Sequence, residues 1–317
     1  MRVHVLVAGA IVSLALVYAP PAHATAYIFT TIMDPLGTTV ATGINDSGQI
    51  VGYYTDSSNA VQGFVDSGGS FTTISDPDAT NGTFAYGINA SGQVAGYYSD
   101  GTGPHGFVET NGGFSTINNP NGTNGTFAYG INAAGQVVGY YLDSTGNAHG
   151  FLDSNGVFTT IDDAGGAFGT FAQGINTAGQ VVGNYSNSDG IQGFLDTSGT
   201  LTDVIDPRAT AGNSKGTFAS GINEFGQIAG YYNDSHGIAH GFVGELGSLM
   251  TLDVPNAANG TFIYGINNAG AIVGYSADAT GSFGFLATPV PEPASLAMMA
   301  AGLLGLGLTQ RRRSDRG

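Results

Sequence analysis

Three histidines occupy equivalent positions of a repeated pattern and are the first candidates for metal chemistry. His105, His149 and His240 each precede a Gly-Phe pair. Zinc needs its ligand nitrogens within about 2.0–2.1 Å. In the ring of repeats argued below, these residues lie roughly 15 Å apart, since adjacent strands are spaced by about 4.8 Å. The three imidazoles therefore cannot share one ion. We expect them to pack and to form hydrogen bonds, and we predict neither a metal site nor a cofactor.

Acidic residues recur where a turn is expected between the second and third strands of each repeat. They are Asp56, Asp100, Asp143, Asp234 and Asp278. A calcium loop would show alternating ligands such as Asp-x-Asp-x-Asp-Gly, and none of these segments has that pattern. We expect the aspartates to initiate turns, with weak surface calcium binding as the alternative.

Six asparagines end the first expected strand of each repeat. They are Asn45, Asn89, Asn132, Asn176, Asn223 and Asn267. In a propeller the first strand lines the central channel, so these amides would form a ring at one channel mouth that could bind a sugar or an ion. The simpler interpretation, which we favour, is that each side chain caps its own Asx turn.

Adjacent tyrosines recur in the second expected strand. The pairs are Tyr53-Tyr54, Tyr97-Tyr98, Tyr140-Tyr141 and Tyr231-Tyr232. Neighbouring residues of a strand point to opposite faces, so most of these rings should be buried between sheets. A few near loop ends could stack on sugar rings, as exposed aromatic side chains do in ligand sites.

Catalytic motifs are missing from the sequence. It has no Gly-x-Ser-x-Gly, no His-Glu-x-x-His, no phosphate-binding loop and no cysteine. A glycosidase would need two carboxylates held together, and the adjacent Asp162 and Asp163 lie where other repeats have Asp-Pro or Asn-Pro. The repeats differ little, except for three extra residues near Arg208–Lys215. We therefore predict no enzyme activity.

The elements that position these residues follow from the tripeptide Gly-Ile-Asn, which starts at Gly43, Gly87, Gly130, Gly174, Gly221 and Gly265. Each repeat of about 44 residues divides into four short strands without helical periodicity. In the third repeat we expect strands at Phe127–Asn132, Gln136–Tyr141, His149–Asp153 and Phe158–Ile161. Alternation places Phe127, Tyr129 and Ile131 on one face of the first strand.

Four antiparallel strands per repeat predict the blades of a β-propeller. The first strand-like segment, Tyr27–Met33, matches a fourth strand that lacks the preceding three. The last segments, from Phe262 to Ala287, match three strands that lack a fourth. We therefore predict an all-β fold, a six-bladed propeller over residues 25–288 whose last blade is closed by the N-terminal strand. Closure removes exposed sheet edges; an open β-solenoid, the alternative, does not explain the split repeat.

The repeats resemble the HAF extracellular repeats of exported bacterial proteins. The resemblance covers Thr38 to about Leu286 and rests on the Gly-Ile-Asn-x-x-Gly-Gln core and on the third-strand triplet. This chain has His-Gly-Phe where the family has His-Ala-Phe, and it has Gln-Gly-Phe at Gln62 and Gln192 and Phe-Gly-Phe at Phe283. The resemblance implies an extracellular protein and no established reaction.

Residues 1–24 have the pattern of a secretory signal peptide. A polar start precedes the apolar run Val5–Tyr18, and Ala22-His23-Ala24 provides the small-x-small pattern that signal peptidase accepts. We predict cleavage between Ala24 and Thr25.

Residues 289–317 have the pattern of a sorting tail. Pro291-Glu292-Pro293 precedes the apolar run Ala294–Thr309 and the basic cluster Arg311-Arg312-Arg313. This order resembles the PEP-CTERM signal of Gram-negative bacteria. The resemblance implies a transmembrane helix that anchors the chain transiently in the inner membrane, recognition by exosortase, and removal of the tail. The product would then reside at the cell surface or outside the cell.

The charge of the chain excludes one class of partner. Its formal net charge is −16, and between residues 25 and 290 only Arg208 and Lys215 are basic. Nucleic acids and anionic lipid headgroups bind through Lys and Arg, so we predict no nucleic-acid partner. Two function classes remain. The first is an exported, non-catalytic surface or matrix protein that binds polysaccharide or another envelope component. The alternative is a propeller hydrolase or lyase acting on extracellular polysaccharide.

Overall fold

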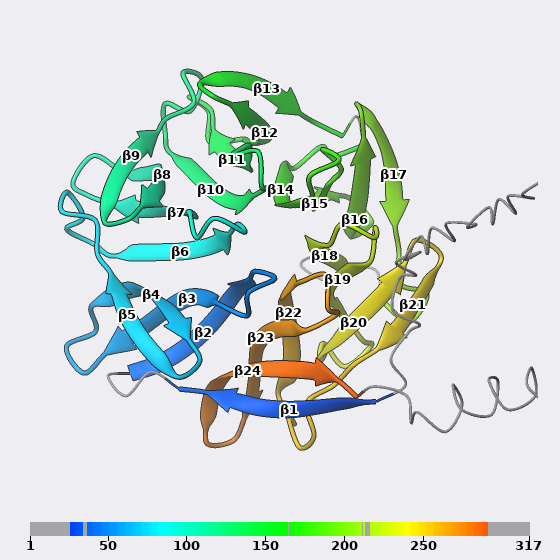
Figure 1. Ribbon diagram of the computed structural model, residues 1–317. Coiled ribbons are helices and arrows are strands. Elements are labelled where there is room, and N and C mark those ends of the chain that lie inside the picture. The colour runs from blue at the N-terminus through cyan, green and yellow to red at the C-terminus, as the bar shows by residue number, and fades with distance from the viewer. Residues whose placement is uncertain (1–25, 34–36, 164, 211, 213–215, 291–317) are drawn as a thin grey trace, which may run out of the picture.

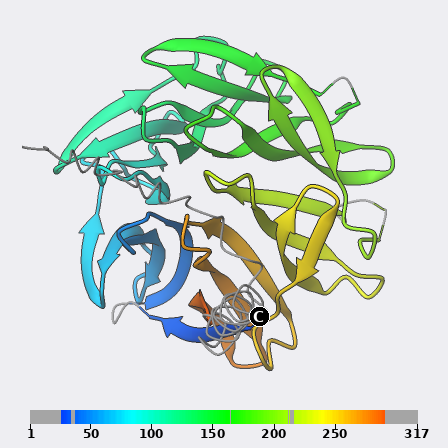
Figure 2. The ribbon, with the colours of Figure 1, turned by 45° about the vertical axis from the view of Figure 1, so that its right-hand side comes forward.

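Six four-stranded antiparallel sheets form a ring around a central axis (Figure 1). The computed structural model describes residues 26–33, 37–163, 165–210, 212 and 216–290. The predicted signal peptide with its cleavage site, and the sorting tail from Pro291 with its transmembrane segment, lie outside the described residues. Within those residues, no helix has the length and apolar character needed to cross a membrane. The same ring is seen obliquely in Figure 2.

In the first three blades the strands follow one another in space as they do in sequence. Blade 1 consists of β2 (Gly37–Ile44), β3 (Ile50–Asp56), β4 (Val61–Ser67) and β5 (Ser70–Ile74). Blade 2 consists of β6 (Thr83–Ile88), β7 (Val94–Ser99), β8 (Pro104–Thr110) and β9 (Gly113–Ile117). Blade 3 consists of β10 (Thr126–Ile131), β11 (Val137–Leu142), β12 (Ala148–Ser154) and β13 (Val157–Ile161).

The next two blades repeat this order, and the last one breaks it. Blade 4 consists of β14 (Thr170–Ile175), β15 (Val181–Asn187), β16 (Gly190–Thr197) and β17 (Thr200–Val204). Blade 5 consists of β18 (Thr217–Ile222), β19 (Ile228–Asn233), β20 (Ala239–Glu245) and β21 (Ser248–Thr251). Blade 6 consists of β22 (Gly260–Ile266), β23 (Ile272–Asp278), β24 (Gly281–Pro289) and β1 (Tyr27–Ile32).

Blade 6 closes the ring by joining the two ends of the described chain. β1 pairs with β24 from Tyr27 opposite Pro289 to Ile32 opposite Gly284. The rings of Phe29 and Phe285 meet edge to face at 5.8 Å, and the Val290 N–H donates to the Ala26 carbonyl at 2.9 Å. The prediction of a six-bladed propeller closed by the N-terminal strand is confirmed.

The core lies between the blades. The phenylalanine that follows the third-strand glycine is fully buried in five blades, at Phe64, Phe107, Phe151, Phe194 and Phe242. Each hydrophobic cluster combines neighbouring blades; for example, Ala95 of blade 2 packs with Ala128 and Phe151 of blade 3. Because both faces of a blade are covered, its strands carry apolar residues on both sides.

Each first strand contains a β-bulge, and the sequence pattern did not indicate it. In blade 3 the register shifts between Ala128 and Gly130. Phe127 and Tyr129 both contact the ring of Tyr140, whereas Ile131 belongs to the cluster of Ala128. A bulge adds one residue and so interrupts the alternation of faces. The prediction that Ile131 shares a face with Phe127 and Tyr129 was therefore wrong.

Candidate functional site

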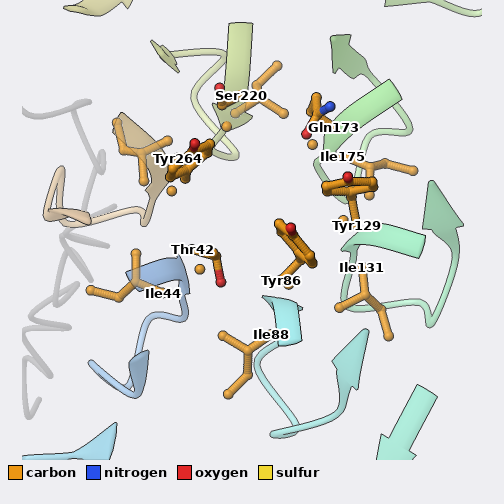
Figure 3. Close-up of a pocket in the computed structure, with 18 residues that line it drawn as sticks. Thr42, Ile44, Tyr86, Ile88, Tyr129, Ile131, Gln173, Ile175, Ser220 and Tyr264 are labelled. Atoms are coloured by element: carbon orange, nitrogen blue, oxygen red, sulfur yellow. The ribbon is translucent and has the colours of Figure 1, made fainter. Parts of the chain in front are cut away.

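An axial channel runs through the ring between the six first strands. Its waist is lined by the Gly-Ile pairs of these strands, and one side chain before each glycine projects towards the axis (Figure 3). These side chains are Thr42, Tyr86, Tyr129, Gln173, Ser220 and Tyr264. The waist encloses only about 80 Å³, so ligands of sugar size would have to bind at the mouths.

The glycines of the waist allow neighbouring first strands to approach closely. A Cβ added at Gly87 would lie 2.4 Å from the Tyr129 carbonyl oxygen, which is backbone of the next blade. A Cβ at Gly43 would lie equally close to the Tyr86 carbonyl oxygen. The first residue of the Gly-Ile-Asn motif is therefore required by packing between blades.

The six predicted asparagines come together at one mouth and form a closed hydrogen-bond ring. The Asn45 amide donates to the Asn89 carbonyl of the next blade at 3.1 Å. The same bond repeats around the ring and ends with Asn267 donating to the Asn45 carbonyl at 3.1 Å. All six donors point in one rotational direction.

The same asparagines also cap their own turns, as predicted. The Asn45 side-chain oxygen accepts the N–H groups of Ser47 and Gln49, at 3.1 and 3.0 Å. In five blades the second amide proton goes to a glutamine four residues later, as from Asn132 to Gln136. Turn capping and contact between blades thus use most of the hydrogen-bond donors and acceptors of these amides. Whether the ring also binds a sugar or an ion stays a prediction.

Four of the residues next to the asparagines add a polar arc at this mouth, around a cavity of about 200 Å³. Asn268 donates to Asp46 at 2.6 Å, and the Glu224 N–H donates to Asn268 at 2.9 Å. The Thr177 hydroxyl donates to Glu224 at 2.7 Å. Both carboxylates therefore receive hydrogen bonds from the protein itself.

The opposite mouth is aromatic. The rings of Tyr86 and Tyr129 lie 4.3 Å apart. Burial raises the pKa of Tyr97 behind them to about 12. Burial also holds the pKa values of Tyr86, Tyr129 and Tyr264 well above the usual value. These tyrosines therefore stay neutral and keep their hydroxyl protons at ordinary pH.

Blades 4 and 5 break the aromatic pattern and open a cavity at this mouth. Asn184 stands where the second strands of the other blades carry Tyr53, Tyr97, Tyr140, Tyr231 and Tyr275. Gln173 and Ser220 stand where blades 2, 3 and 6 have Tyr86, Tyr129 and Tyr264; blade 1 has Thr42 there, outside this cavity. The cavity encloses about 340 Å³, and its wall combines these three polar side chains with rings such as Phe171, Phe218 and Tyr231. We refer to it below as the axial pocket.

The patterns used for prediction did not single out the axial pocket. They emphasised what the repeats share, whereas this cavity arises where they differ. The signal that would have found it is the loss of tyrosine at positions 173, 184 and 220. The expected packing of tyrosines between blades is present: Tyr54, Tyr98, Tyr141 and Tyr232 are buried.

The charge around these cavities is one-sided. Among the described residues, Arg208 is the only lysine or arginine. Its guanidinium is 2.6 Å from the buried Asp206 carboxylate and lies over the Tyr232 ring at 5.0 Å. Arg208 thus contacts the loop between blades 4 and 5 and the second strand of blade 5. It lines neither mouth of the channel.

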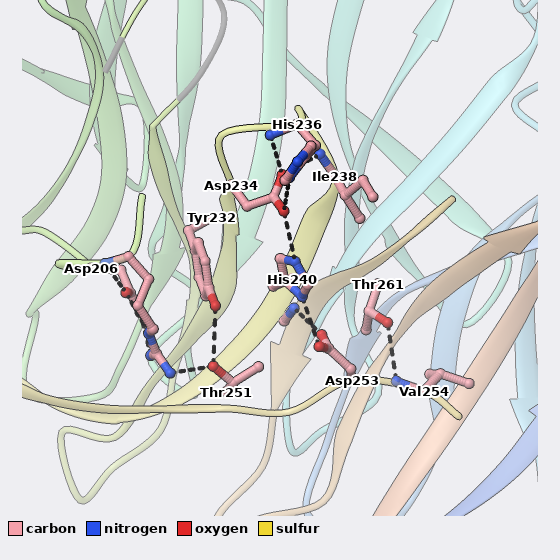
Figure 4. A network of polar contacts seen from close by, with 12 residues as sticks. Asp206, Tyr232, Asp234, His236, Ile238, His240, Thr251, Asp253, Val254 and Thr261 are labelled. Carbon is pink, nitrogen blue, oxygen red and sulfur yellow. Dashed lines mark hydrogen bonds and ion pairs between the residues drawn. The ribbon is translucent and has the colours of Figure 1, made fainter. Parts of the chain in front are cut away.

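The three repeat histidines lie in separate blades, each between two polar side chains. Figure 4 shows His240, whose Nδ1 is 2.8 Å from Asp253 and whose Nε2 is 3.6 Å from Asp234. His149 lies between Asp162 and Asp143, and His105 between Asn118 and Asp100. Each ring stacks on the tyrosine of its second strand. Within the described ranges, no group of three or more His, Asp or Glu is arranged to hold a metal ion.

Electrostatics at two of these histidines favour the charged form. Burial opposes protonation of His149 and His240, but the hydrogen bonds and charges of their paired aspartates outweigh it and raise both pKa values.

The repeat aspartates initiate turns as expected. Asp56 accepts the N–H groups of Ser58 and Ala60, and Asp143 and Asp234 make the same bonds in their own blades. These hydrogen bonds lower the pKa of Asp234 to about 2. The weak calcium alternative stays a prediction.

Comparison with known proteins identifies the tail of the chain. Residues 289–313 match the PEP-CTERM protein-sorting motif. This motif implies an exported protein that is anchored transiently in the membrane and processed by exosortase. The comparison with curated proteins gave no significant match. The resemblance to HAF repeats stays a prediction.

Three solved structures illustrate the likeness of the ring to other proteins. A mutant of AofleA from Arthrobotrys oligospora has 11% identity and a TM-score of 0.49, over 86% of this chain and 94% of that one. The Aleuria aurantia lectin with Fucα1-6GlcNAc has 11% identity and a TM-score of 0.45, over 84% and 99%. TolB from Acinetobacter baumannii has 13% identity and a TM-score of 0.49, over 75% and 63%. At these values the likeness assigns no ligand to this chain.

Proposed function

We propose that this exported protein is a non-catalytic surface protein that binds neutral polysaccharide through the axial pocket. The observation that carries the proposal is the composition of that pocket. Aromatic rings supply apolar faces for the C–H surface of a sugar, and Gln173, Asn184 and Ser220 supply donors and acceptors for its hydroxyls. Its volume of about 340 Å³ falls within the usual range for small-ligand sites.

The charges support a neutral ligand. An anionic sugar would need Lys or Arg to offset the net charge of −16. The only described Lys or Arg is Arg208, and it is held by Asp206. The tyrosines at the mouth are neutral, so the pocket offers hydrogen bonds and stacking without a charge.

A variant that refills the pocket tests the proposal. Gln173→Tyr/Asn184→Tyr installs the tyrosines that blade 3 already carries as Tyr129 and Tyr140, so the ring should keep its fold. On an array of neutral bacterial polysaccharides we expect the parent protein to bind and the double variant to lose at least tenfold in affinity. The matched control is Phe168→Ser, which removes a 66% exposed aromatic side chain before β14 without altering the pocket.

Two results would contradict the proposal. Equal binding by the parent and the refilled variant would place the ligand elsewhere. Release of new reducing ends from the bound polysaccharide would favour the alternative, a propeller hydrolase or lyase.

A further inference from the structure

A further cavity lies between blades 1 and 2, away from the axis. It encloses about 330 Å³ and is lined by the β3–β4 turn at Asn59 and Ala60, by Gln62 and Ser75, and by the loop from Ala79 to Thr83. We refer to it as the outer pocket. None of its lining residues is charged.

Beside the outer pocket, blade 1 lacks the histidine clamp of blades 3 and 5, in which a histidine is hydrogen-bonded to the aspartate that follows the fourth strand. In blade 3 the equivalent space holds His149, hydrogen-bonded to Asp162 at 2.8 Å. Blade 1 carries Gln62 in place of the histidine and Ser75 in place of the aspartate. Both replacements are shorter or thinner than the residues they replace, so the space beside them is not filled.

Gln62 carries an unmet hydrogen-bonding requirement. Its side-chain oxygen is the one buried side-chain N or O atom, among the described residues, that has no hydrogen-bond partner. A buried polar atom left unpaired costs roughly 1–3 kcal/mol. That oxygen is not accessible to solvent in this conformation. A half-turn of the amide exchanges it with the nitrogen, and a hydroxyl, which both donates and accepts, can pair with whichever atom faces the pocket.

Other polar groups around the outer pocket also suit a hydroxylated ligand. Asn81 uses one amide proton on the Asp100 carbonyl at 3.1 Å, which leaves its other amide atoms for a ligand. Thr80 and Ser75 add two hydroxyls to the lining. Asp56 begins the turn that contributes Asn59, and Asp76 follows Ser75, so negative charge surrounds the pocket and disfavours an anion.

The outer pocket opens on the same end of the blades as the axial pocket. Its walls come from the β3–β4 turn and from the loop that leads into β6. The axial pocket likewise takes Phe171 and Phe218 from the starts of β14 and β18, and Ile191 from the start of β16. Contacts between side chains join the two pockets. Tyr53 lines the axial pocket, and its ring centre is 5.3 Å from that of Phe84. The Phe84 ring in turn lies 3.2 Å from the place that a Cβ on Gly82, in the lining of the outer pocket, would occupy.

We propose that the outer pocket is a second subsite, which binds a neutral hexose unit through Gln62. As a subsite, it would hold another unit of the polysaccharide that the axial pocket binds. This part of the proposal rests on the proposed function, whereas the binding of a hexose by Gln62 does not. Two linked sites raise the affinity for a polymer far above that for a single sugar unit.

Glutamine side chains report on the two pockets separately. Gln62 lies in the outer pocket and Gln173 in the axial pocket. In protein labelled with ¹⁵N-glutamine, each side-chain NH₂ pair is assigned by its loss in Gln62→His/Ser75→Asp or in Gln173→Tyr/Asn184→Tyr. The probes are methyl glycosides of glucose, galactose, mannose and N-acetylglucosamine, with glucuronic acid as the anionic control.

We expect at least one methyl glycoside to shift the Gln62 signal saturably. The same shift should occur in the Gln173→Tyr/Asn184→Tyr protein, whose axial pocket is filled. Glucuronic acid should bind at least tenfold more weakly than that glycoside. Gln62→His/Ser75→Asp rebuilds the clamp of blade 3, so it should fold and lose the outer site while the Gln173 signal still responds. A Gln62 signal that no glycoside moves overturns this proposal. A Gln62 response without a Gln173 response supports it and contradicts the axial site instead.

Discussion

At the scale of single residues, the histidine clamps link stability to pH. His149 and His240 each gain two aspartate neighbours on folding, and their pKa values rise above the unfolded value. A raised pKa means that the folded state binds the proton more tightly. The stabilisation is complete below the unfolded pKa of about 6.5 and is lost as the pH rises through the higher folded value.

We therefore expect His149→Gln/His240→Gln to flatten the pH dependence of thermal unfolding above pH 6. Glutamine is the natural residue at this position in blades 1 and 4, as Gln62 and Gln192, so the variant should fold. The clamps are partly exposed, which limits the effect to a melting temperature lower by roughly 1–3 °C at pH 6 and unchanged at pH 9. His105→Gln is the comparison, because that ring faces one carboxylate, Asp100, and the neutral Asn118, whereas His149 and His240 each face two carboxylates. An equal loss at both pH values would mean that the imidazoles act by packing alone.

Residue types also mark the limit of prediction from this sequence. Asn-x-x-Gly turns, Asx caps and the aspartate turns follow from local hydrogen bonding, so they could be predicted. The bond from each asparagine amide to the next blade could not, because it depends on where the neighbouring carbonyl lies after the ring has formed. The two pockets depend on substitutions at Asn184, Gln173, Gln62 and Ser75, whose effect appears only when they are compared with the equivalent residues of other blades.

At the scale of elements, the first strands are held at a spacing that only glycine permits. Gly87 has no room for a Cβ because the Tyr129 carbonyl of the next blade lies 2.4 Å from the position that the Cβ would occupy. Backbone cannot move aside as the end of a flexible side chain can. The contact between neighbouring first strands is therefore the least tolerant part of the ring.

We expect Gly87→Ala to lower the free energy of unfolding by about 1–3 kcal/mol, as overpacking of a core does. Denaturant titration followed by tyrosine fluorescence measures it. Gly101→Ala is the matched control, because no atom lies within 4 Å of its added Cβ, and it should leave the midpoint unchanged. Equal stability of the two variants would show that the first strands can separate without cost.

Strand number and order could be predicted from the period of the repeats, whereas strand faces could be predicted only in part. The bulge between Ala128 and Gly130 recurs in every blade at the same place. It leaves no signature in the alternation of large and small residues, because glycine fits both a regular strand and a bulge. Ile131 was misplaced for this reason.

At the scale of the whole molecule, the pairing of β1 with β24 decides whether the ring is closed. Deleting residues 26–33 removes β1 and exposes the edge of β24, whose backbone groups would then invite pairing with another chain. We expect the deletion variant to aggregate or to unfold at a much lower temperature than the parent. A synthetic peptide of residues 26–33 should restore solubility by adding the missing strand in trans.

Ile28→Thr is the control for this deletion. Ile28 is 62% exposed, so its replacement changes the composition of β1 but not its pairing. Should the deletion variant melt at the temperature of the parent, the closure would be dispensable and the ring would be held by contacts between blades alone.

The position of β1 has a consequence for the timing of assembly. Among the strands that the structure describes, β1 is the first to be synthesised and β24 is the last. β1 therefore waits, unpaired, until every other blade exists, and the sorting motif begins at the end of β24. A chain that is truncated anywhere before β24 cannot close and also lacks its sorting motif. The pairing of β1 with β24 therefore forms only in chains that extend through all six blades to the start of the sorting motif.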